Sequence, residues 1–151
     1  MGSNVLLMAS THIAHDCLIG DNVILSNLST LGGHVKIGNW AILGGGVLVH
    51  QFTQIGEHSL IGGGFRAVQD VPPFILAANH PLKYKGVNIV GLKRRGFSKQ
   101  DRDLIKQAYK IFFRSGANRK KAMERIESDL PKTKVIQNIL EFIKHSNRGI
   151  I

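Results

Sequence analysis

A six-residue repeat of large aliphatic side chains constrains the fold of this 151-residue chain more than any other feature. Every sixth position holds Leu, Ile or Val for ten consecutive steps, and glycine follows the aliphatic residue at six of them. Helices bury side chains with a period of about 3.6 residues and strands with a period of 2, so neither explains this spacing. The repeated positions are Leu7, Ile13, Ile19, Leu25, Leu31, Ile37, Leu43, Val49, Ile55 and Ile61.

Such a repeat predicts a parallel β-helix, in which three six-residue faces form a triangular coil of 18 residues. The aliphatic side chain points inward and the glycine allows the backbone to turn the corner. Equivalent residues of successive coils then stack about 4.8 Å apart, at the usual distance between strands. Residues 37–56 carry no charge, but their five glycines and polar side chains exclude a membrane-spanning helix.

The composition changes near the Pro72-Pro73 pair, where glycine becomes rarer and helical patterns begin. Ser98 and Asn118 are suitable N-caps for two helices, and apolar residues from Val135 to Ile143 indicate a third. We therefore expect a β-helix over residues 1–75, a basic connecting loop over 76–97, and a small α-helical C-terminal domain over 98–151.

The positive charge is concentrated in the second half of the chain. The net charge is +10, and 18 of the 20 Lys and Arg residues follow residue 80, so a polyanionic partner is expected. Nucleic acid is disfavoured, because aromatic residues are only 7% of the chain and no nucleic-acid-binding motif accompanies the charge. The single Cys17 and the absence of a secretion signal after Met1 favour the cytoplasm. Lys93, Arg94 and Arg95 form a cationic cluster suited to a diphosphate.

Four of the seven histidines fall on one side of the predicted β-helix when the chain is divided into 18-residue coils. They are His12, His15, His34 and His50. Histidine accepts and returns protons near neutral pH, so this cluster indicates a general base. A zinc site built from the same imidazoles is the alternative. Asp16 either orients a neighbouring imidazole or only solvates a turn, and Cys17 suits an inward core position.

Several segments together resemble the acyl-carrier-protein-dependent UDP-N-acetylglucosamine O-acyltransferases of lipid A biosynthesis. The segments that carry the resemblance are HIAHDC (residues 12–17), GHV (33–35), VHQF (49–52), QDVPP (69–73), GVNI (86–89) and GLKRRGFS (91–98). The resemblance spans this chain but only the C-terminal portion of the family, whose preceding coils have no counterpart here. It implies a left-handed parallel β-helix followed by a small helical domain.

The resemblance also implies a function. The expected reaction is transfer of an (R)-3-hydroxyacyl chain from acyl carrier protein to the 3-hydroxyl of UDP-N-acetylglucosamine, the first step of lipid A biosynthesis. The expected assembly is a cytoplasmic homotrimer with sites between subunits. The acyl donor is the phosphopantetheine thioester of the carrier protein, and no other cofactor, metal ligand, nucleic acid or integral membrane segment is expected.

Site residues follow from the same resemblance. His15 matches the family's general base, and the backbone N–H of Gly33 matches its oxyanion donor. Gly63 matches the position where side-chain size limits acyl length. The remaining matches are substrate-binding positions, namely His12, His34, His50, Gln51, Asn88, Arg94 and Arg95.

Two alternatives remain open at this stage. One is an inactive or non-catalytic trimeric fragment that binds acyl carrier protein. The other is a zinc-dependent, carbonic-anhydrase-like hydratase on a related β-helix.

Overall fold

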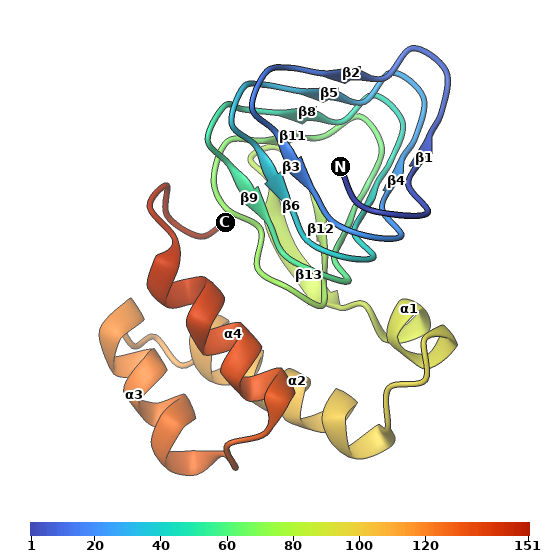
Figure 1. Cartoon of the computed structure of the whole chain (residues 1–151). Coiled ribbons are helices and arrows are strands. Elements are labelled where there is room, and N and C mark those ends of the chain that lie inside the picture. Colours follow the sequence, from blue (N-terminus) through green and yellow to red (C-terminus); the bar gives the residue numbers. More distant parts are fainter. The chain divides into compact units, whose positions relative to one another are not determined.

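The computed structural model describes all 151 residues and divides them into two compact units. One unit joins Met1–Asn88 with His145–Ile151, and the other is Ile89–Lys144. The first unit is a parallel β-helix, whose stacked coils are visible in Figure 1. The second unit is helical.

Short strands on three faces build the β-helix. The six-stranded sheet contains, in spatial order, β1 (Leu6–Leu7), β4 (Ile24–Leu25), β7 (Ile42–Leu43), β10 (Leu60–Ile61), β12 (Ile75–Ala78) and β13 (Lys83–Val87). The four-stranded sheet contains β11 (Arg66–Ala67), β8 (Leu48–Val49), β5 (Thr30–Leu31) and β2 (His12–Ile13). The three-stranded sheet contains β3 (Leu18–Ile19), β6 (Lys36–Ile37) and β9 (Gln54–Ile55).

The register of these sheets confirms the predicted 18-residue coil. Ile19 pairs with Ile37 and Ile37 with Ile55, each step covering 18 residues. The second residue of each strand from β1 to β10 is the repeated aliphatic, and from Ile19 to Ile61 all of these side chains are buried. The aliphatic ladders therefore form the interior of the coil, as the hexapeptide period predicts.

The segment 76–97 differs from the expected connecting loop. Residues Lys83–Val87 form β13, which pairs antiparallel with β12, and Ile89–Arg94 form the short helix α1. The six-residue repeat has ended by this point, so it could not predict the antiparallel pair of β12 and β13. Antiparallel pairing satisfies backbone groups of β12 that would otherwise lie at the open edge of the sheet.

The remaining helices are α2 (Lys99–Arg114), α3 (Arg119–Asp129) and α4 (Lys134–His145). The two predicted caps are confirmed, because Ser98 Oγ accepts the Asp101 N–H and Asn118 Oδ1 accepts the Lys121 N–H. Buried apolar residues line one face of each of these helices. No helix combines the length and the apolar character needed to cross a membrane.

The last seven residues belong to the β-helix unit rather than to the helical unit, although we expected a helical domain over 98–151. Asp70 forms a parallel bridge with Ile150, and its backbone N–H donates to Gly149 O over 2.8 Å. Ser146 Oγ donates to the buried Asp70 Oδ2. These hydrogen bonds hold the C-terminal segment on the β-helix.

Candidate active site

One corner of the β-helix carries the predicted catalytic residues. It is formed by the turns that connect the four-stranded sheet to the three-stranded sheet on successive coils. Asp16, His34 and Phe52 occupy the same place on three coils, 18 residues apart, with φ angles of 59°, 60° and 66°. This left-handed backbone is uncommon for residues other than glycine, asparagine and aspartate. Three stacked side chains therefore project from equivalent positions of the corner.

The side chains of this corner form a contiguous cluster. His15 Nδ1 and Asp16 Oδ2 are 2.9 Å apart, at hydrogen-bonding distance. The rings of His15 and His34 meet edge to face at 5.1 Å between centroids, and His34 stacks on Phe52 at 4.8 Å. The side chains of His15 and Asp16 are 73% and 66% exposed, so a substrate can reach them from solvent.

Gly33 lies directly beneath the His15 imidazole. A Cβ atom on Gly33 would lie 2.7 Å from both Cε1 and Nε2 of His15, so only glycine leaves room for the ring in this position. The Gly33 carbonyl accepts the Phe52 N–H, whereas no hydrogen bond within the chain uses the Gly33 N–H. An unused backbone donor beside an imidazole can stabilise an oxyanion.

Asp16 is held in its ionised form. The hydrogen bond from His15 lowers the pKa of the Asp16 carboxyl below its ordinary value of 3.8, and the charge of His34 lowers this pKa further. A carboxylate that accepts Nδ1–H orients the imidazole and leaves Nε2 to act as the base. The structure thus supports the orienting role for Asp16, which the sequence left undecided.

The other predicted residues of this region lie nearby but outside the cluster. His12 is exposed on β2, which belongs to the four-stranded sheet. His50 and Gln51 belong to the same corner one coil further along, and His50 Nδ1 lies 3.1 Å from Gln51 O. Figure 1 shows the stacking of β2, β5 and β8, which lead into these turns.

Gly63 and Asn88 are not brought to this corner within one chain. Gly63 lies between β10 and β11, at another corner. Asn88 is only 4% exposed, and its Nδ2 donates to His58 O at the third corner. Arg94 and Arg95 belong to the helical unit, where burial and the charge of Arg94 lower the pKa of Arg95.

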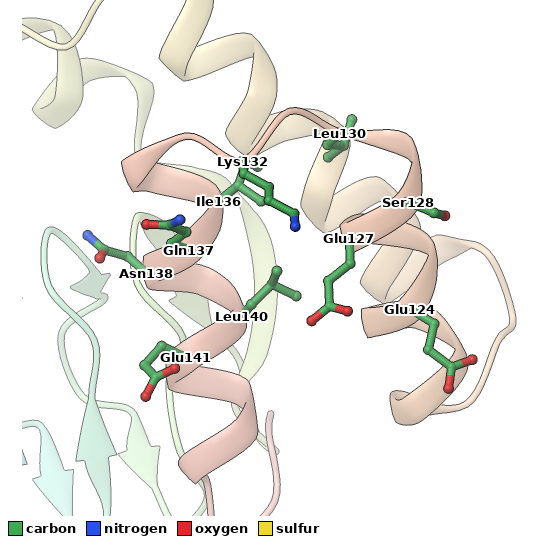
Figure 2. A pocket seen from close by; sticks show the side chains of 10 residues that line it. All are labelled: Glu124, Glu127, Ser128, Leu130, Lys132, Ile136, Gln137, Asn138, Leu140 and Glu141. Atoms are coloured by element: carbon green, nitrogen blue, oxygen red, sulfur yellow. The ribbon is translucent and has the colours of Figure 1, made fainter.

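A groove of about 940 Å³ lies in the helical unit between α3 and α4. Figure 2 shows Glu127 and Lys132 directed toward the space between the two helices, near Leu140. None of the predicted site residues lines it, and it contains neither a histidine nor a cysteine. It is therefore a weaker candidate for proton-transfer chemistry than the His15 corner.

Phe52 contacts the cluster through His34, although the sequence analysis did not single it out. Its position exactly one coil after His34 was a usable signal, because equivalent residues of successive coils stack. The cluster of His15, Asp16 and His34 also places three possible metal ligand atoms within 4.8 Å of one another. The corner can thus supply an oriented base, an oxyanion donor, or ligands for a metal ion.

Comparisons with known proteins agree with this fold. Residues 1–33 match the family model described as bacterial transferase hexapeptide (six repeats), which defines the class of the β-helix. Residues 70–151 match the family model described as UDP N-acetylglucosamine O-acyltransferase, domain 2. The chain therefore belongs to the UDP-N-acetylglucosamine O-acyltransferase family.

Individual relatives point the same way. The acyl-[acyl-carrier-protein]–UDP-N-acetylglucosamine O-acyltransferase of Aliivibrio salmonicida is 45% identical over 151 residues, which are all of this chain and 58% of the relative. The crystal structure of the UDP-N-acetylglucosamine acyltransferase from Bacteroides fragilis superposes with a TM-score of 0.97 at 42% identity, covering 98% of this chain and 58% of that one. The Arabidopsis enzyme gives a TM-score of 0.94 at 35% identity, covering 99% and 56%. The chain thus spans somewhat more than half the length of these relatives.

Proposed function

We propose that this chain carries out acyl transfer from acyl carrier protein to UDP-N-acetylglucosamine, as the names of its relatives describe. The acyl group is an (R)-3-hydroxyacyl chain, its acceptor is the 3-hydroxyl of the sugar, and the step opens lipid A biosynthesis. The observation that carries this proposal is the corner where Asp16 orients His15 directly above Gly33, whose N–H is unused.

The geometry supports one sequence of proton transfers. His15 Nε2 takes the proton of the sugar hydroxyl while Nδ1–H donates to the Asp16 carboxylate. The sugar oxygen attacks the thioester carbonyl, and the Gly33 N–H stabilises the negative oxygen of the tetrahedral intermediate. The intermediate collapses as the carbon–sulfur bond breaks, and the proton on His15 passes to the leaving thiolate. The reaction needs no metal ion, because acyl transfer from a thioester requires only a base and an oxyanion donor.

The other predicted residues are proposed to bind the substrates. His12, His34, His50 and Gln51 surround the reacting corner, Arg94 and Arg95 provide charge for the diphosphate, and Gly63 leaves room for the acyl chain. Gly63 and Asn88 lie at two different corners from His15. This separation supports a site that is shared between neighbouring copies, as in a homotrimer.

The proposed homotrimer also has a candidate contact face. An aliphatic row lies on the outward side of the six-stranded sheet, where Leu6, Ile24, Ile42 and Leu60 pair in register. Leu6 is exposed and the other three side chains are partly buried. A continuous aliphatic row of this kind marks an interaction surface. The basic residues Lys99, Lys106, Lys110 and Arg114 of α2 are exposed and suit an acidic carrier protein in the cytoplasm.

The test is mass spectrometric detection of acylated UDP-N-acetylglucosamine after incubation of the purified chain with hydroxyacyl carrier protein. His15→Ala should lower the rate by at least about 100-fold, the usual contribution of a general base. His145→Ala is the matched control, because His145 is exposed and lies outside the corner. Equal rates in wild type and His15→Ala would contradict the role of His15.

The same assay tests the alternative that the chain is a non-catalytic fragment that binds acyl carrier protein. Turnover by the wild-type chain excludes that alternative, whereas binding of carrier protein without turnover supports it. The zinc-dependent hydratase has no support from the family to which the chain belongs.

A further inference from the structure

We propose that the corner cluster of His15, Asp16 and His34 binds one divalent transition-metal ion, typified by Zn²⁺, and that the bound ion blocks the active site. The metal is an inhibitor and takes no part in the proposed acyl transfer. Metal binding does not depend on the proposed function. Inhibition does, because it requires that the chain catalyses acyl transfer.

The ligand atoms already have nearly the spacing that a tetrahedral ion requires. Zn–N and Zn–O bonds of about 2.0–2.2 Å at tetrahedral angles place neighbouring ligand atoms about 3.4 Å apart. Asp16 Oδ2 lies 2.9 Å from His15 Nδ1 and 3.7 Å from His34 Nε2. All three ligand atoms lie within 4.8 Å of one another, so small movements of the exposed side chains bring them to that spacing.

The surroundings favour an ion without enclosing it. The Phe52 ring stacks on His34 and limits the orientations of that imidazole. The three ligand side chains are between 43% and 73% exposed, so an ion can enter directly and retain water at its fourth position. Two neutral imidazoles and one carboxylate are also a donor set that zinc commonly uses.

Metal binding and acyl transfer exclude each other at this cluster. Coordination uses the lone pair of His15 Nδ1 and leaves the proton on Nε2, which then cannot accept a proton from the sugar hydroxyl. The ion also occupies the Asp16 oxygen that orients the imidazole. The cluster therefore either holds the metal or acts as the base.

The experiment uses untagged wild-type chain that has been freed of metal with a chelator. Isothermal titration with Zn²⁺ should show one ion per chain, and Co²⁺ should give the visible absorption of a four- or five-coordinate site. The variants are Asp16→Asn and His34→Asn, because asparagine tolerates the left-handed backbone of these positions. His145→Asn is the control that removes a histidine outside the cluster.

Mutation of residues that only hydrogen-bond to metal ligands changes metal affinity by about 10–100-fold. Loss of a direct ligand should therefore weaken Zn²⁺ binding by at least about tenfold in each variant. The control should bind as wild type does. Equal Zn²⁺ binding by wild type and both variants, or no binding by wild type, would overturn the metal site. In the transfer assay Zn²⁺ should inhibit and chelator should restore activity. Stoichiometric binding without inhibition of an active enzyme would overturn the competition.

Discussion

At the scale of single residues, the His15 corner uses a left-handed backbone that recurs at the other corners of the coil, and it carries the proposed chemistry. Asp16, His34 and Phe52 all adopt positive φ. A non-glycine residue in this region costs about 1–2 kcal/mol, so the stacked coils must hold these residues in place. This backbone brings Asp16 to the adjacent His15, although neighbouring residues of a regular extended strand point to opposite faces. It also stacks His34 on Phe52 of the next coil.

Gly33→Ala should disable the site without unfolding the chain. The new Cβ would lie 2.7 Å from the His15 ring and displace it, while the Gly33 backbone does not require positive φ. If the imidazole loses its position, the rate should fall by about 100-fold or more, as for loss of a general base. Steady-state kinetics and a thermal melt measure the two effects. An unchanged rate would show that the imidazole does not act from this position.

The pKa of the Asp16 carboxyl should depend mainly on the hydrogen bond from His15. The pKa of Asp16 is lowered from 3.8. Stabilisation by the ionised carboxylate is therefore present above that value and is lost as pH falls through the lowered pKa. Titration of the carboxyl carbon by NMR should show this depression in wild type. The pKa should rise more in His15→Ala than in His34→Ala, since the hydrogen bond is the larger cause. The opposite order would contradict the proposed dyad.

At the scale of elements, one buried carboxylate connects the C-terminal segment to the last coils. Asp70 Oδ1 accepts the Gln54 N–H over 2.7 Å, and Asp70 Oδ2 accepts the Ser146 hydroxyl. The Arg148 side chain donates to Val68 O nearby. The segment after α4 is therefore part of the β-helix unit through specific hydrogen bonds, in addition to the bridge at Ile150.

Removal of this carboxylate should cost measurable stability. Asp70→Ala leaves the Gln54 and Ser146 donors without their acceptor, which should lower the free energy of unfolding by about 1–3 kcal/mol. Urea unfolding of Asp70→Ala, Ser146→Ala and the double variant should reveal coupling between the two sites. The control is Asp21→Ala, because Asp21 accepts the Ser3 N–H at an exposed site. Equal losses in Asp70→Ala and Asp21→Ala would refute the structural role of Asp70.

At the scale of the whole molecule, the two units differ in charge as well as in fold. The β-helix carries the aliphatic interior and the histidine corner, whereas most of the basic residues belong to the helical unit. The proposed acyl transfer therefore belongs to the β-helix, whereas the proposed attraction of an acidic carrier protein belongs to the helical unit. Assembly of several copies would then supply each corner with residues from a neighbour.

A charge on the outward aliphatic row should weaken that assembly. Ile42→Arg places a cation in the centre of the row formed by Leu6, Ile24, Ile42 and Leu60, where a partner would have to desolvate it. Sedimentation velocity should show trimers for wild type and smaller species for the variant. Leu18→Arg is the matched control, because Leu18 is 61% exposed on the three-stranded sheet beside Lys36. Identical sedimentation of all three proteins would remove this face from the proposed interface.

The β-helix and the helix caps could be predicted because their signals are local or periodic. The six-residue period places each aliphatic inside, and the cap side chains of Ser98 and Asn118 bond to backbone groups three residues away. The 18-residue coil also predicted that His15 and His34 would share one side, and their ring contact confirms this.

Only the tertiary structure decided how the individual side chains meet. Division into 18-residue coils could not tell that His15 and His34 touch, while His50 lies beside the carbonyl of Gln51. The hydrogen bond between Asp70 and Ser146 joins residues 76 positions apart. The whole helical unit lies between them in the sequence, and the six-residue repeat does not extend through it. Periodicity determines the place of a residue on a repeating backbone, whereas contacts between side chains depend on rotamers and on packing between segments far apart in the chain.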